Sequence, residues 1–122
     1  MGMSGLKAAG DISANQFEAV KLSADMTVTS IAANTDCPVG ILQNNPNAAG
    51  QAAEVAGPGE RCKARYGGTV TIGQRLSVDN DGELVAVTEG TDTTRYIIAK
   101  AFEAGANQEV HEVLVLTPHR AA

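Results

Sequence analysis

Short apolar segments alternate with turn-forming residues along most of this 122-residue chain, and this cadence limits the folds that the chain can adopt. Clusters of Gly, Pro, Asn and Asp recur at 57–59, 67–68, 79–82 and 105–107. Turn signals every ~8 to 12 residues are typical of small β-sandwiches and barrels. No stretch between the turns has the length and the 3.6-residue apolar period of a crossover helix. We therefore expect a mainly β protein, a single-domain antiparallel β-barrel or sandwich of short strands.

The turns divide the chain into a series of expected strands. Just before the first, Ser13 and Gln16 fit a capping box for one helical turn. Residues 94–104 can be drawn as a helix, but the β-branched and aromatic run at Tyr96 favours a strand. The final strand is expected to be buried on both faces and to stop at Pro118. The expected strands are 17–22, 26–31, 38–43, 51–56, 61–66, 70–72, 75–78, 84–88, 96–103 and 110–116.

Length and composition favour one small domain with a modest core. Residues 1–10 are rich in Gly, Ala and Met without periodicity, so we expect a flexible N-terminal arm followed by a β-rich domain over 11–122. Aromatic residues make up only 3% of the chain and Trp is absent. Small side chains bury little apolar area each, so such a core gains little free energy per residue. Burial of further surface in an oligomer would help this domain.

The charge balance bears on the possible partners. Nine Lys and Arg against fourteen Asp and Glu give a net charge of −5. An acidic domain lacks the attraction to phosphate that drives nucleic-acid binding, so we expect no nucleic-acid partner. No apolar run approaches the ~20 residues that span a bilayer, so we expect no membrane partner. The N-terminus lacks a secretory signal, and we expect synthesis in a cytoplasm.

The groups that could carry chemistry do not form a recognisable site. The turn Asp79-Asn80-Asp81-Gly82 lacks the bidentate Glu of a calcium loop and fits an Asp-Gly hairpin turn. On a strand, Glu109 and His111 share one face and Glu112 points away, so they offer two metal ligands at most. We expect no catalytic residue, no metal, no cofactor and no small-molecule substrate.

Two cysteines, Cys37 and Cys62, allow one bridge by number. A reducing compartment favours free thiols instead.

An uncharged block spans residues 37–53 and suits packing and assembly better than chemistry. Its apolar run at 39–42 leads into a loop of Asn44, Asn45, Pro46 and Asn47. Asn and Pro favour shaped turns through side-chain hydrogen bonds and a fixed φ. The loop is a candidate interface, and a plain surface loop is the alternative.

A second candidate interface is a basic stripe. Arg61, Lys63 and Arg65 alternate with smaller or apolar residues, which places three cations on one strand face of an acidic protein. These charges could simply keep a sheet edge from aggregating. The other interpretation is contact with an acidic partner surface, either another subunit or an underlying lattice.

Several segments together resemble the capsid cement (decoration) proteins of tailed bacteriophages. They are DISANQF at 11–17 with AVKL at 19–22, and PVGILQNNP at 38–46 with AGQAA at 49–53. GQRL at 73–76, DNDG at 79–82 and EVHEVLV at 109–115 fit the same family's alternation of turns and short strands. The likeness covers about residues 11 to 117, and 38–53 is its most specific part.

The resemblance implies a β-rich structural virion protein without catalytic residues. Such a protein binds the outside of an icosahedral phage head, commonly as a homotrimer, and fastens neighbouring major capsid proteins. Its place would be the outer capsid surface of the virion, after synthesis in the bacterial host cytoplasm. The alternative from the sequence is a non-catalytic β-barrel binding or carrier module.

Overall fold

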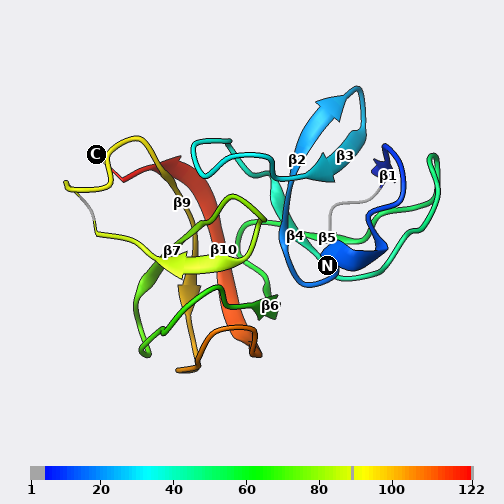
Figure 1. Ribbon diagram of the computed structural model, residues 1–122. Helices are drawn as coiled ribbons and strands as arrows, with labels where there is room; N and C mark the ends of the chain where they lie inside the picture. The colour runs from blue at the N-terminus through cyan, green and yellow to red at the C-terminus, as the bar shows by residue number, and fades with distance from the viewer. Residues whose placement is uncertain (1–4, 89, 122) are drawn as a thin grey trace.

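The computed structural model describes residues 5–88 and 90–121 and contains two five-stranded sheets (Figure 1). The chain is mainly β, as expected, and the described residues contain one short 3-10 helix, η1 (Ser13–Asn15), and no α-helix. The first sheet has the order β1-β3-β2-β4-β5 and the second β6-β10-β9-β7-β8. The first sheet's strands are β1 (Lys7–Ala8), β2 (Ala19–Ala24), β3 (Thr27–Ser30), β4 (Gly40–Leu42) and β5 (Val55–Ala56). The second sheet's strands are β6 (Arg61–Arg65), β7 (Arg75–Val78), β8 (Leu84–Ala86), β9 (Tyr96–Ala101) and β10 (Val110–Arg120).

Both sheets curl until their edges meet. In the second sheet, an isolated bridge joins Tyr66, just after edge strand β6, to Leu84 on the opposite edge strand β8. In the first sheet, β1 pairs in parallel with β3 on one side and through Lys7 with Ala52, just before β5, on the other. The Tyr66–Leu84 bridge is also parallel, and the other pairs of named strands are antiparallel. The curling leaves few unpaired strand edges, which are the sites where sheets aggregate.

The core consists of two clusters that share the first sheet. Alternation along β4 places Ile41 in the larger cluster with second-sheet residues such as Leu76, and Leu42 in the smaller cluster. The smaller cluster lies between β1, β2, β3 and the segment around β5 and includes Leu6 and Val28. Both faces of the first sheet are therefore used, and the larger cluster joins the two sheets into one body.

The N-terminal segment differs from the expected flexible arm in its described part. Leu6 and Ala8 are buried, and residues 7–8 form β1. The Ala53 N–H donates to the Leu6 carbonyl, and the Ala8 N–H donates to the Gln51 carbonyl. A two-residue strand gives no periodic signal, so sequence patterning could not find it. Residues 1–4 lie outside the described residues.

Most of the expected strands are present, and the differences have local causes. The first expected strand begins at Ala19 rather than at Phe17, because Phe17 adopts a φ of 70°. Residues 70–72 form only an isolated bridge between Val70 and Gly105. Residues 96–101 form a strand, not the helical alternative. The 79–82 segment forms the expected turn of a β7–β8 hairpin.

Three further expectations are wrong. The capping box does not form: Gln16 donates instead to the Gln43 carbonyl, and η1 has no side-chain cap. The last strand does not stop at Pro118 but runs to Arg120, with a register shift between Val115 and His119. Proline is tolerated there because a bulge needs no ladder N–H from it. Nor is this strand buried on both faces, since Leu114 and Leu116 are only half-buried.

Candidate interaction surface

Strand β6 carries the predicted basic stripe, and its three cations differ in exposure and in their contacts. Arg61 and Lys63 are exposed, while the residues between them face the core. Arg61 Nε lies 3.6 Å from the Glu112 carboxylate on the neighbouring strand β10. Arg65 turns toward the first sheet, where its Nε lies 3.9 Å from Glu18 Oε2, and it also donates to the Gln108 carbonyl. Arg65 therefore joins the two sheets, which leaves Arg61 and Lys63 on the open face.

The outer edge of β6 is covered by the first half of the chain. The Gln43 amide donates to the Lys63 carbonyl at 2.9 Å and accepts from the Lys63 N–H at 3.3 Å, in the manner of a neighbouring strand. The Arg65 N–H donates to the Phe17 carbonyl at 2.8 Å. The edge of β6 is thus covered by a neutral glutamine that no sequence signal singled out, together with the Phe17 carbonyl.

The loop of Asn44, Asn45, Pro46 and Asn47 is shaped by internal hydrogen bonds. Asn44 donates to the Ala52 carbonyl and accepts from the Glu54 N–H, so its side chain closes the loop. Pro46 is buried, while Asn45 and Asn47 are exposed. Two of the four residues predicted to form an interface are therefore exposed to solvent.

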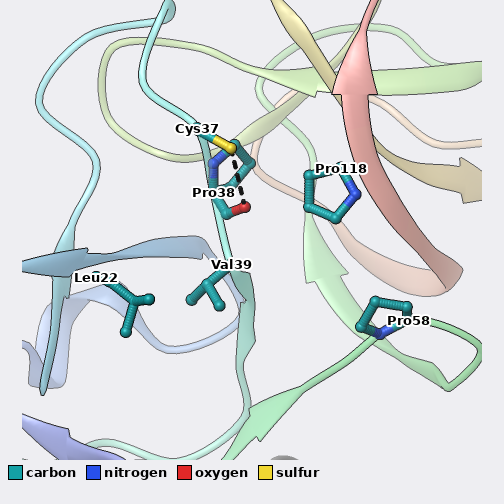
Figure 2. Close-up of a pocket in the computed structure, with 6 residues that line it drawn as sticks. All are labelled: Leu22, Cys37, Pro38, Val39, Pro58 and Pro118. Atoms are coloured by element: carbon teal, nitrogen blue, oxygen red, sulfur yellow. Dashed lines mark hydrogen bonds between the residues drawn. The ribbon is translucent and has the colours of Figure 1, made fainter. Parts of the chain in front are cut away.

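A small apolar groove opens between the two sheets (Figure 2). Its volume is about 380 Å³, and Figure 2 shows Leu22 and Val39 on one side and Pro58 and Pro118 on the other. Cys37 and Pro38 complete the lining. The thiol of Cys37 is the one reactive group among these six residues, and no base or oriented acid lines the groove with it.

The two cysteines are both free. Cys37 is exposed, whereas Cys62 is buried under β6. Burial, together with Glu112 and Glu60, raises the pKa of the Cys62 thiol to about 12. A thiol with so high a pKa is a poor nucleophile near neutral pH.

His111 sits between two carboxylates at the end of the second sheet. Its Nε2 lies 3.0 Å from Glu109 and its Nδ1 lies 3.3 Å from Glu103, and its ring packs on Tyr66 at 5.4 Å. Hydrogen bonds to Glu109 and then to Glu103 raise the pKa of His111. Glu109 and His111, which were predicted to share a face, are therefore in contact. The second ring nitrogen of His111 contacts Glu103, which the sequence did not indicate. His111 thus connects Glu103, just after β9, with Glu109, just before β10. We call these three residues the His111 clamp.

The acidic turn brings three carboxylates together within the described part of the chain. Oxygens of Asp79, Asp81 and Glu83 lie within 4.8 Å of one another. Asp79 Oδ1 already accepts from the backbone N–H groups of Asp81 and Glu83, and Glu83 accepts from Gln108. The hydrogen bonds to Asp79 belong to the hairpin turn, so the turn itself explains why the three carboxylates lie close together.

Across residues 5–88 and 90–121, no helix combines the length and the apolar character needed to cross a bilayer.

Comparison with known proteins finds a likeness among solved structures. No family model matches the chain, and no curated protein sequence matches it. Among solved structures, the chain is similar to the crystal structure of the N base of head fiber gp8.5 from bacteriophage phi29. The TM-score is 0.64 and the sequence identity 18%, over 92% of this chain and 90% of that one. At this identity the two proteins share a fold, across nearly the whole length of both chains.

Proposed function

We propose that this protein is a non-catalytic structural virion protein, a capsid cement that binds the outer surface of an icosahedral phage head. The observation that carries this proposal is the fold likeness, over 92% of the chain, to a domain described as the base of a phage head fiber. The sequence segments at 11–22, 38–53 and 109–115 independently resemble phage cement proteins. Two separate lines, fold and sequence pattern, therefore support the same class of protein.

The mechanism would be stabilisation by preferential binding. A ligand that binds the assembled shell, and not its dissociated subunits, shifts the equilibrium toward the shell. Contacts with neighbouring major capsid proteins would tie those proteins together. A homotrimer would multiply several weak contacts through avidity.

The exposed predicted residues fit such a role. Asn45, Asn47, Arg61 and Lys63 are exposed, and the groove between the sheets is lined by apolar side chains and a single thiol. Amide, cationic and apolar side chains of this kind suit contact with another protein surface. Of the seven predicted interface residues, we retain these four as contact candidates and assign Asn44, Pro46 and Arg65 to internal structure.

Co-sedimentation tests the proposal. Purified protein is mixed with expanded phage capsids that lack their decoration protein, and the pellet is assayed for bound chain. Saturable binding to expanded capsids, with none to unassembled capsid protein, is the expected result. A protein that stays in the supernatant with every capsid offered would contradict the proposal and favour the binding or carrier module. Analytical ultracentrifugation of the free protein then decides between monomer and trimer.

A further inference from the structure

The second sheet gathers cations from several strands into one row on its outer face. In the strand register, Arg61 on β6 is opposite Leu114 on β10, and Leu114 is opposite Lys100 on β9. Lys100 is in turn opposite Arg75 on β7. Directly opposed residues of antiparallel strands share one face, so these four side chains form a single row. We call Arg61, Leu114, Lys100 and Arg75 the basic row.

Burial places this row on the face away from the core. The residues that flank Leu114 and Lys100 along their strands are fully or almost fully buried, whereas Lys100 is exposed and Leu114 half-buried. Arg75 is exposed beside buried Leu76, and the Arg61 side chain is 66% exposed. The row therefore crosses four neighbouring strands on the outer face of the second sheet.

The charge of this row is opposite to that of the whole chain. Three cations lie in one row of a protein whose net charge is −5. The adjacent row adds Lys63, which is opposite Glu112. Glu112 also pairs with Arg61, so this acid offsets only part of the positive charge. An acidic surface is the complementary partner for such a face, because opposite potentials guide encounter and fix orientation.

Apolar side chains accompany the cations and favour a protein partner. Leu114 stands in the middle of the row, and Phe102, 39% exposed, follows β9 close to it. The Gly73 N–H donates to the Ala101 carbonyl, which brings exposed Ile72 to the same end of the sheet. Arg together with apolar and aromatic groups is the composition of protein interfaces.

We infer that the basic row is the docking face of this protein for an acidic protein surface. The identity of that partner as the shell protein rests on the proposed function. The sequence stripe along β6 is only the margin of this face, because Lys100 and Arg75 are joined to Arg61 by strand register and not by sequence proximity.

A matched pair of charge reversals tests the docking face on capsids. Lys100→Glu places an acid in the row, whereas Lys7→Glu makes the same change at the exposed position of strand β1 in the first sheet. We expect Lys100→Glu to weaken capsid binding at least about tenfold, since like charges across an interface repel, and Lys7→Glu to bind as wild type. Lys100→Ala, which removes the charge without adding an acid, serves if the reversal unfolds the sheet. Equal binding by the Lys100 variants and wild type would overturn the inference.

A second measurement tests the docking face in the absence of capsids. Amide chemical shifts are followed while poly-L-glutamate, or a single-stranded DNA oligonucleotide of equal charge, is titrated into the protein. We expect poly-L-glutamate to perturb Arg61, Leu114 and Lys100 more strongly than DNA does. A stronger response to DNA, or no response of these residues to either polymer, would overturn the inference. If poly-L-glutamate binds the row while capsids are ignored, the docking face stands and the proposed function fails.

Discussion

At the scale of single residues, the side chains of Gln43 and Arg65 form contacts that join the two halves of the chain. Gln43 supplies both a donor and an acceptor to Lys63 on the edge of β6, and Arg65 reaches across to buried Glu18. Desolvation raises the pKa of Glu18, and the nearby Glu83 adds to this. The Asn15 side chain, which donates to Glu18 Oε1 at 2.9 Å, and then the Arg65 guanidinium oppose that rise.

Replacement of Gln43 tests this connection. Gln43→Ala removes both partners of the Lys63 backbone, and we expect a loss of about 1–2 kcal/mol in the free energy of unfolding. Urea denaturation measures it. Gln51→Ala, which removes only a local bond to the Asn47 N–H, is the control and should cost less. Equal losses would show that Gln43 plays no special part between the sheets.

The cysteines make a separate prediction. In the native protein a maleimide reagent at pH 7.5 should label Cys37 and leave Cys62 unmodified, since burial raises the pKa of Cys62 to about 12. Denaturation should expose both thiols to the reagent. Mass spectrometry of the labelled peptides reads the result, and rapid native labelling of Cys62 would contradict its placement.

The His111 clamp predicts a pH dependence of stability. The folded pKa of His111 is raised above its ordinary 6.5, so the clamp contributes fully below about pH 6.5 and is lost as the pH rises through the folded pKa. The two carboxylates have lowered pKa values, so they stay ionised over this range. The difference in melting temperature between wild type and His111→Gln should therefore be larger at pH 6 than at pH 9. The opposite trend would refute an imidazolium between Glu103 and Glu109.

At the scale of elements, the sequence predicts strands well and their partners poorly. The periods and turn residues locate β3, β6, β7 and β9 to within a few residues, because alternation and Gly-rich turns are local signals. Register is not local: nothing in the sequence places Lys100 beside Arg75 or brings Glu103 to His111. Short segments whose pairing is tertiary, such as β1, are missed for the same reason, and Pro118 misleads because the bulge around it is set by neighbouring strands.

The β7–β8 hairpin provides a test of such tertiary pairing. Gly82 has a φ of 91°, and its carbonyl accepts from the Ala19 N–H on β2, so the hairpin tip touches the first sheet. A Cβ at Gly82 would lie 2.9 Å from the Ala19 carbonyl oxygen. We expect Gly82→Ala to lower the free energy of unfolding by about 1–3 kcal/mol more than Gly73→Ala, which has a similar φ and open space around it. Calorimetry of the two variants compares them, and equal losses would mean that only backbone strain matters.

At the scale of the whole molecule, two curled sheets share one core and present different surfaces. The segment 5–60 contains two Lys and six Asp or Glu, a sum of −4, whereas the remaining residues hold most of the cations. The segments that connect the strands of the first sheet carry these acids, and the outer face of the second sheet carries the basic row. An uneven charge distribution of this kind orients a small protein on a charged lattice.

The thermal stability of decorated shells tests whether this protein stabilises the assembled capsid. Expanded capsids that lack decoration are heated with increasing concentrations of the protein, and shell disruption is followed by light scattering. If the protein binds only the assembled shell, the disruption temperature should rise with its free concentration, and a Lys100→Glu variant should need more protein for the same rise. A disruption temperature that stays constant at concentrations that saturate binding would contradict the account.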